Sequence, residues 1–198
     1  MSPQTIIFIG RSGCGKSTQA KLLTEYLEKI DQNKRKIYHV ETGEKFRDFI
    51  KGENLTSRLS KQVYDNVERQ PDFLAITMWT RAFIDNLTGD EHLIIDGAPR
   101  SLPEAYILNG ALNFYNRRAN IIYLNVRREW SEKMLAARGR EDDSTKAKIE
   151  KRLNWFDTDV VPAIGYFKEE NKHNVVEVKG ERPQEEVLAD IIAGLKIF

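Results

Sequence analysis

The sequence predicts an α/β protein whose parallel β-sheet is covered by helices on both faces. Short runs rich in β-branched and aromatic residues recur along the chain, and segments with helical periodicity separate them. Strands that alternate with helices form parallel sheets, because each parallel connection needs a crossover long enough to hold a helix. The length of 198 residues suits one domain with a sizeable core.

Five apolar runs are the predicted strands. They are TIIFI (5–9), KIYHV (36–40), HLIID (92–96), NIIYLNV (120–126) and NVVEV (174–178). A helix is expected over 16–30, because Ala20, Leu23, Leu27 and Ile30 share one face.

Two further helices are expected in the second half of the chain. The apolar stripe over 145–172 predicts a long helix, with a kink or a break near Pro162, which lacks a backbone N–H group. The last helix is expected to begin near Pro183 and to continue to the C-terminus.

The interval between the second and third predicted strands contains no convincing strand. Helical patterns cover 43–51, 56–66 and 72–87, and Pro71 opens the last of them. A structureless loop of this length is uncommon in a compact domain. The interval is therefore predicted to be a small helical insertion.

Charge and composition exclude several classes of protein. The 31 basic and 30 acidic residues give a net charge of +1, so no long-range field favours nucleic acid or an anionic membrane. The apolar runs are too short to cross a bilayer, and MSPQT does not resemble a secretory signal. The single cysteine, Cys14, excludes an intramolecular disulfide and a multi-cysteine zinc site. We expect a cytoplasmic protein without zinc.

The segment GRSGCGKS, Gly10–Ser17, matches the P-loop pattern G-x-x-x-x-G-K-[ST]. A predicted strand precedes it and an amphipathic helix follows, as that pattern requires. Its glycines let backbone N–H groups converge on phosphate oxygens, and the helix N-terminus adds a favourable dipole. Lys16 can reach the β- and γ-phosphates, and the Ser17 hydroxyl can bind Mg²⁺. The segment therefore predicts a site for a nucleoside triphosphate with Mg²⁺.

Two questions about this loop stay open at the level of sequence. The helix N-terminus could lower the thiol pKa of Cys14 and make it oxidisable, or Cys14 could simply be a small residue whose N–H faces phosphate. A GTPase should carry N-K-x-D, but NKRK (33–36) and NKHN (171–174) both lack the aspartate. Another part of the chain must therefore select the phosphate acceptor.

Four motifs make the chain resemble the adenylate kinases. GRSGCGKSTQAKLL (10–23), ETGEKFR (41–47), IIDGAPR (94–100) and RGREDD…KRL (138–153) occur in the order found in that family, and VPAIGYFKE (161–169) and VVEVKGERPQEEV (175–187) extend the resemblance over nearly the whole chain. It implies a single P-loop NTPase-type domain with a five-stranded parallel sheet. The core would comprise 1–41 and 88–198, with a nucleoside monophosphate-binding helical insertion at about 42–72 and a minimal lid at about 138–144.

The resemblance also implies a set of site residues. ATP would be bound by Gly13, Cys14, Gly15, Lys16, Ser17, Thr18, Arg138 and Gly180. The acceptor nucleotide would be bound by Thr42, Arg47, Gly97, Arg100 and Glu104. Catalysis would depend on Lys16, Arg100, Arg140 and Arg152. Mg²⁺ would be held by Ser17 directly and by Asp96 through water.

Physical chemistry gives most of these roles a reason and some of them an alternative. A planar guanidinium such as that of Arg100 can bind two phosphate oxygens at once, and Pro99 stiffens the turn that carries it. The lid arginines Arg138 and Arg140, with Arg152, would match the charge that spreads over a transferring phosphoryl group, or they could belong to a solvated helix face. Thr42 could equally be a plain helix N-cap.

Three departures from the family pattern bear on the acceptor and the lid. Only Gly139 separates the two lid arginines, so closure could screen water poorly and permit ATP hydrolysis; acceptor-free ATPase activity no higher than in a long-lid relative would count against this hypothesis. VERQP (67–71) replaces a Gly-x-Leu-Val-Pro-like segment. Glu104 replaces a glutamine that reads adenine, and an ionised carboxylate can accept hydrogen bonds but cannot donate them.

The sequence therefore predicts a Mg²⁺- and ATP-dependent nucleoside monophosphate kinase, with adenylate kinase activity (ATP + AMP ⇌ 2 ADP) as the leading hypothesis. An alanine is usual at the position of Thr42 in the pyrimidine-directed relatives, so a purine acceptor is favoured. GMP, UMP or CMP as acceptor, a catalytically impaired nucleotide-binding protein and a kinase for a non-nucleotide metabolite are the alternatives. The expected partners are small-molecule nucleotides only, and the chain is expected to act as a monomer.

Overall fold

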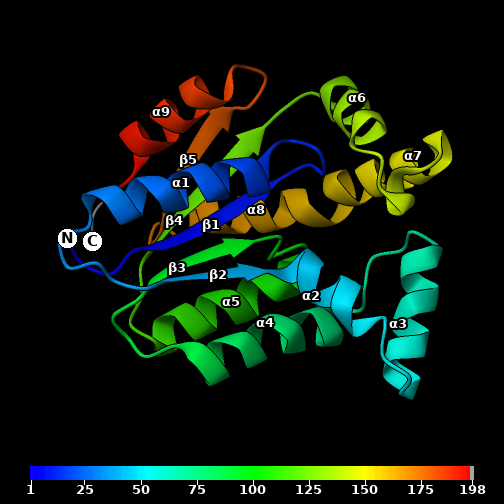
Figure 1. The fold of residues 1–198 in the computed structure, drawn as a ribbon, viewed down its shortest axis with the longest axis horizontal. Coiled ribbons are helices and arrows are strands. Elements are labelled where there is room, and N and C mark those ends of the chain that lie inside the picture. The colour runs from blue at the N-terminus through cyan, green and yellow to red at the C-terminus, as the bar shows by residue number, and fades with distance from the viewer. Residues whose placement is uncertain (197–198) are drawn as a thin grey trace.

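Five parallel strands form the centre of the molecule (Figure 1). The structure is a computed structural model and describes residues 1–196, apart from the side chain of Glu141. The strands are β1 (Thr5–Gly10), β2 (Ile37–Glu41), β3 (His92–Asp96), β4 (Ala119–Asn125) and β5 (Asn174–Lys179), in the spatial order β2-β3-β1-β4-β5. Every neighbouring pair is parallel. The predicted five-stranded parallel sheet is confirmed.

Helices cover both faces of the sheet, as predicted. The α-helices are α1 (Lys16–Ile30), α2 (Thr42–Phe49), α3 (Leu55–Asp65), α4 (Asp72–Asn86), α5 (Leu102–Phe114), α6 (Arg128–Arg138), α7 (Lys146–Trp155), α8 (Val161–Glu169) and α9 (Gln184–Gly194). In Figure 1, α1 and α9 lie over one face, and α4, α5 and α8 lie over the other. None of the helices described within residues 1–196 has the length and apolar character needed to cross a membrane.

The two faces of the sheet belong to two separate hydrophobic clusters. Along β1, Ile6 and Phe8 join the side chains of α1 and α9, whereas Ile7 and Ile9 join those of α4, α5 and α8. This division follows from the alternation of side chains along a strand. Because both faces are covered, β1 is apolar at nearly every position, as expected for a parallel sheet.

The long helical stretch of the second half changes its winding just before Pro162. Residues Phe156–Val160 form a single π-helical turn between α7 and α8. A proline inside a helix removes one hydrogen bond, and its ring clashes with the carbonyl of the residue four positions earlier, here Thr158. A local widening of the helix accommodates that clash. The predicted interruption is therefore present, as a wider turn rather than as a break.

The three predicted helices of the insertion are present, whereas the last helix differs from its prediction. Helices α2, α3 and α4 correspond to the three predicted helical pieces, and Trp79 and Phe83 bury α4 in the core cluster of one sheet face. The last helix ends at Gly194 and Leu195 is extended, so the prediction of a helix to the C-terminus is wrong. Residues 197–198 lie outside the described part of the chain.

Candidate active site

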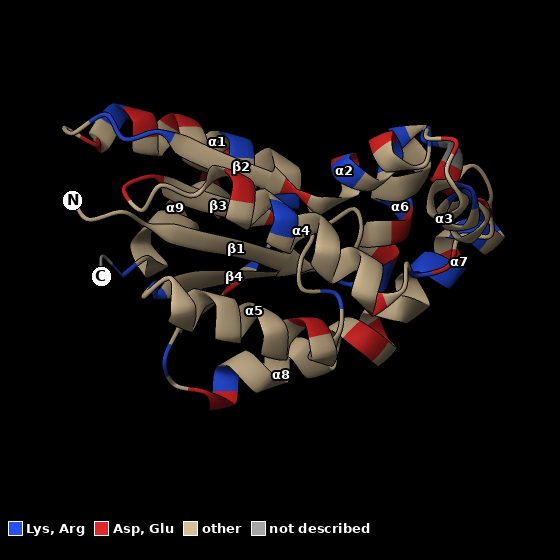
Figure 2. Ribbon diagram, turned by 90° about the horizontal axis from the view of Figure 1, so that it is seen from below, with Lys and Arg blue, Asp and Glu red and all other residues tan. Residues whose placement is uncertain are grey.

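A cavity of about 840 Å³ opens at the carboxyl ends of the strands. Its walls come from the P-loop, α2, the α3–α4 connection, the end of β3, α6, α7 and the turn between β5 and α9. Figure 2 shows that charged residues gather on α2, α3, α6 and α7 at this end of the molecule, whereas α5 is nearly free of them. Ligands of open α/β sheets bind at this edge.

The P-loop connects β1 to α1 and forms the floor of the cavity. Gly15, directly before the first residue of α1, adopts a left-handed backbone conformation with φ of 96°. This conformation is costly for any residue with a side chain. The ammonium group of Lys16 donates to the carbonyl oxygens of Gly10 and Arg11 at 2.8 and 2.9 Å. All the ATP-binding residues predicted from this loop line the cavity: Gly13, Cys14, Gly15, Lys16, Ser17 and Thr18.

The Cys14 thiol lies under the loop and is almost fully buried. Burial raises its pKa, and the nearby charge of Lys16 opposes that rise only in part. The Lys16 Nζ to Cys14 Sγ distance is 3.7 Å. A buried, protonated thiol is a weak nucleophile, so this environment favours the reading of Cys14 as a small loop residue over an oxidisable one.

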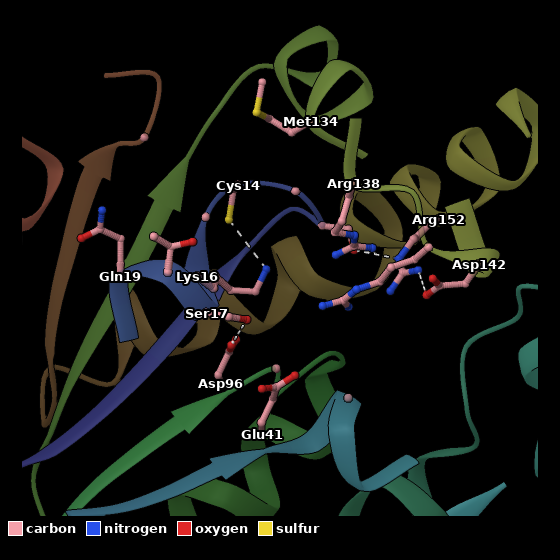
Figure 3. A pocket seen from close by; sticks show the side chains of 18 of the residues that line it. Cys14, Lys16, Ser17, Gln19, Glu41, Asp96, Met134, Arg138, Asp142 and Arg152 are labelled. Carbon is pink, nitrogen blue, oxygen red and sulfur yellow. Dashed lines mark hydrogen bonds and ion pairs between the residues drawn. The ribbon is translucent and has the colours of Figure 1, made fainter. Parts of the chain in front are cut away.

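Ser17 and Asp96 meet at one corner of the cavity (Figure 3). Ser17 is in the first turn of α1, and Asp96 is the last residue of β3. The hydroxyl of Ser17 donates to Asp96 Oδ2 at 2.5 Å. A hydroxyl and a carboxylate are oxygen donors of the kind that Mg²⁺ prefers, so the pair fits the predicted metal site. No cluster of three or more His, Cys, Asp or Glu side chains with metal-binding geometry is found in the described residues.

Two arginines line the side of the cavity near α2. Arg47 is ion-paired with Glu41 at 2.9 Å, and Arg100 Nε donates to the carbonyl of Gly97 at 2.8 Å. Gly97 has φ of 88°, and a Cβ atom there would lie 2.9 Å from Arg100 Nη2. The pKa of Arg100 is lowered, first by burial and next by the charge of Arg152. An anion bound between Arg100 and Arg152 would relieve the repulsion between their guanidinium groups.

Two consecutive carboxylates, Asp142 and Asp143, hold Arg138 of the lid and Arg152 of α7. Arg138 Nε donates to Asp143 Oδ2 at 2.9 Å. Arg152 is ion-paired with both Asp142 and Asp143, and its Nε donates to the hydroxyl of Ser12 in the P-loop at 3.1 Å. Figure 3 shows the side chains of Arg138 and Arg152 close together beside the phosphate loop. Arg140 is exposed and also lines the cavity.

Two predicted acceptor residues are not on the cavity wall. Thr42 is the first residue of α2 and is buried, and its hydroxyl has no partner among the described residues. The N-cap position belongs to Glu41, so the alternative of Thr42 as a capping residue is wrong. Glu104 is only 1% exposed, and its Oε2 has no partner in the described part of the chain. Burial raises the pKa of Glu104 to about 7, against the opposing charge of Arg100.

The last predicted ATP-binding residue lies across the cavity from the lid. Gly180 follows β5, lines the cavity and donates its N–H to Asn125 O at 3.0 Å. The turn that begins there is tied to α1, because the Gln19 amide nitrogen donates to Gln184 O at 3.0 Å. One cavity therefore holds the phosphate cradle, the oxygen pair and arginines from several elements.

Comparison with known proteins agrees with this arrangement. The family model for adenylate kinase matches residues 8–172. The chain belongs to the adenylate kinase family. Adenylate kinase 1 of Nostoc sp. is 28% identical over 191 residues, which cover 96% of this chain and 97% of that protein. The adenylate kinase of Prochlorococcus marinus is 31% identical over 165 residues, or 83% and 84% of the two chains. That of Bacteroides fragilis is 28% identical over 190 residues, or 94% and 95%.

In this member of the adenylate kinase family, several cavity residues were missed by sequence reasoning. Trp130 and Met134 line the cavity from α6, and Figure 3 shows Met134 above the phosphate loop. Both precede Arg138 at intervals of four residues, so helical spacing alone places the three on one face. Trp155 lines the cavity from the end of α7. Asp142 was quoted only as part of the lid motif, although it is an ion-pair partner of Arg152.

Proposed function

We propose that this chain is a Mg²⁺- and ATP-dependent kinase that converts ATP and AMP into two molecules of ADP. The observation that carries the proposal is the convergence of the P-loop cradle with Arg47, Arg100 and Arg152 on one cavity. Two nucleotides would share the cavity of about 840 Å³, and their phosphate groups would approach each other between these cations. Membership of the adenylate kinase family supports the same reaction.

On the donor side, the loop backbone would hold the phosphates of ATP while Lys16 neutralises their charge. Lys16 is held by two loop carbonyls, so its ammonium group already lies inside the cradle. Ser17 and Asp96 would hold Mg²⁺, the aspartate through water. When bound, Mg²⁺ would offset the negative charge that develops on the phosphate groups. Gly180 and Arg138 would border the remainder of the nucleotide.

On the acceptor side, Arg47 and Arg100 would clamp the phosphate of the monophosphate. The acceptor would displace Glu41 from Arg47 and would occupy the space next to Arg100. Phosphate groups suit guanidinium groups because the planar fork can donate to two oxygens. A general base is not required, because the attacking phosphate is already an anion.

Arg140 and Arg152 would stabilise the transferring phosphoryl group. Phosphoryl transfer needs little covalent chemistry from the protein, and positioning with charge stabilisation provides most of the rate. Arg152 donates a hydrogen bond to the Ser12 hydroxyl of the P-loop, and its positive charge helps to lower the pKa of Arg100. Both relations support a position of Arg152 near the donor and the acceptor phosphates.

A second candidate acceptor is GMP, because of Glu104. An ionised carboxylate would pair with the N–H donors of guanine and would repel adenine N1. The raised pKa of about 7 changes this argument, since a neutral carboxyl can donate one hydrogen bond and accept another, as a glutamine does. Below about pH 7, where the neutral form predominates, this property favours AMP over GMP as the acceptor.

The remaining parts of the proposal concern organisation. The segment 42–72 would close over the acceptor, and 138–144 would act as the minimal lid over the triphosphate. The chain would act as a cytoplasmic monomer on free nucleotides, without nucleic acid, membrane or zinc. The near-balanced charge supports the exclusion of polyanionic partners.

An acceptor panel tests the function. Purified protein with Mg²⁺ and ATP receives AMP, GMP, CMP or UMP, and ADP production is followed. We expect ADP formation with AMP at the highest kcat/KM. Higher kcat/KM with GMP would overturn only the choice of acceptor, whereas no acceptor-dependent ADP with any of the four would overturn the kinase assignment.

A further inference from the structure

Arg11 is a charged residue of the phosphate loop that contacts a helix instead of the cavity. The cavity wall begins at Ser12, the next residue. Arg11 Nη1 donates to Asp157 Oδ1 at 2.7 Å, and the guanidinium carbon lies 4.4 Å from the centre of the Phe156 ring. Both partners belong to the π-helical turn that follows α7 directly. The side chain therefore joins the loop to the end of the helix that carries Arg152.

Other contacts fix the same helix end from different sides. The Phe156 ring stacks on Tyr123 of β4, with centroids 6.3 Å apart and planes inclined by 22°. Arg128, in the first turn of α6, also reaches Asp157, at 3.4 Å. The end of α7 is thus held between the phosphate loop, the sheet and the base of α6. Single π-helical turns of this kind occur frequently at functional sites.

The Arg11 contact is poorly suited to a role in stability alone. The Asp157 side chain is 46% exposed, and ion pairs of such exposure contribute little to folding. The contact does, however, bear on the distance between the loop and α7. The adjacent residue Ser12 receives the hydrogen bond from Arg152 Nε. Two successive loop residues therefore contact this helix. Arg11 contacts Asp157 in the π-helical turn, and Ser12 contacts the catalytic candidate Arg152 in α7.

We propose that Arg11 is a positioning residue for phosphoryl transfer, which holds α7 in register with the phosphate loop so that Arg152 meets the transferring group. The inference rests on the proposed kinase function. Arg11 does not touch the phosphates in this account and acts only through Arg152. Because a misplacement of about 1 Å can lower a rate by about 100-fold, loss of Arg11 should lower kcat while the KM values for both nucleotides change little.

A double-mutant cycle tests this role. The variants are Arg11→Ala, Arg11→Lys, Asp157→Asn, Arg152→Ala and the double variant, and Arg81→Ala is the matched control because it removes an exposed arginine–aspartate pair on α4. We expect Arg11→Ala and Asp157→Asn each to lower kcat by about 10- to 100-fold, and Arg11→Lys to recover part of that loss. In the Arg152→Ala background, adding Arg11→Ala should lower kcat by less than about a further twofold.

Two results would overturn the inference. One is an equal loss of kcat from Arg11→Ala in both backgrounds, which would mean that Arg11 does not act through Arg152. The other is a raised KM for ATP with unchanged kcat, which would indicate direct phosphate binding. If Arg11→Ala fails to fold, Asp157→Asn carries the test alone, because its side chain is half-exposed. Absence of transfer activity in the wild-type chain would overturn the proposed function. An active wild type with either of the two results above would overturn only the role of Arg11, so the two failures are distinguishable.

Discussion

The Ser17 hydroxyl and the Asp96 carboxylate, 79 positions apart in the chain, are joined by a hydrogen bond of 2.5 Å. The contact depends on the parallel pairing of β1 and β3, in which Phe8 lies opposite Asp96. That register places the end of β3 beside the start of α1, which follows β1 through the phosphate loop. Strand order thereby brings together the hydroxyl and the carboxylate that we propose to hold Mg²⁺.

The first prediction concerns this oxygen pair. Asp96→Asn should raise the Mg²⁺ concentration for half-maximal activity and lower activity by about 10- to 100-fold, because water-mediated partners of a metal typically contribute that much. Initial rates across a Mg²⁺ titration measure the effect, and removal of Mg²⁺ with a chelator should abolish transfer by the wild type. An unchanged Mg²⁺ dependence in Asp96→Asn would remove this residue from the metal site.

The second prediction concerns Arg152. Arg152→Ala should lower kcat by about 10³- to 10⁵-fold, the range found for arginines that stabilise a transferring phosphoryl group. The substitution also leaves the buried Asp142 and Asp143 without this partner, so Arg152→Lys is needed as a variant that keeps the charge. Steady-state kinetics and the thermal midpoint of each variant separate the two effects. A loss below about tenfold in the folded alanine variant would contradict the assigned role.

The third prediction concerns Glu104, whose folded-state pKa is raised to about 7. A carboxyl that stays protonated in the folded state while the unfolded chain releases its proton loses stability as pH rises from about 4.5 to about 7. Glu104→Gln cannot ionise and should therefore be more stable than the wild type at pH 8, with the two curves converging near pH 4.5. Urea unfolding across this range measures the difference.

The same variant tests contact with the acceptor base. If neutral Glu104 reads adenine, the KM for AMP should rise in the wild type above about pH 7 and should stay flat in Glu104→Gln. Parallel pH profiles in the two proteins would mean that Glu104 does not face the base.

The fourth prediction concerns His92, a buried histidine at the start of β3. Its Nδ1 accepts from the N–H of Gln4 at 3.0 Å, so the proton belongs on Nε2, which faces Asp31 Oδ2 at 3.2 Å. Burial lowers its pKa below the usual 6.5, against the opposing effect of Asp31. The unfolded chain therefore binds more protons below pH 6.5, and stability falls as pH falls below that value.

Urea unfolding of wild type and His92→Gln between pH 7 and pH 5 measures this contribution. The difference between their free energies of unfolding should change by at most about 1.4 kcal/mol per pH unit, which is the limit for the uptake of one proton. His173→Gln is a second, independent test, since His173 has a similar arrangement with Ala119 N and Asn109 and a pKa that burial lowers in the same way. Identical pH dependence in wild type and His92→Gln would contradict the assigned protonation state.

The sheet and the phosphate loop could be predicted because local signals determine them. A P-loop requires a preceding strand and a following helix, and β1 and α1 occupy those positions within one residue of the predicted bounds. Asp96 could be placed at a strand end because the apolar run stops there. These features depend on residues that are close together in the sequence, so the sequence alone predicts them.

Features that depend on distant packing could not be predicted. The burial of Glu104, which is 1% exposed, could not be read from the sequence, because it depends on packing between elements that are distant in the chain. The contact between Arg11 and Asp157 joins positions 146 residues apart and leaves no local pattern. The end of α9 at Gly194, two residues before the end of the described chain, is likewise not marked by the helical periodicity.

The most direct test of the central claim uses ADP as the only nucleotide. Wild-type protein is incubated with ADP and Mg²⁺, and the nucleotides are separated by chromatography at successive times. We expect ATP and AMP to form in equal amounts until equilibrium, since two ADP molecules would occupy the donor and acceptor sides of the same cavity. ADP that remains unchanged, under conditions in which the protein is folded, would contradict the account.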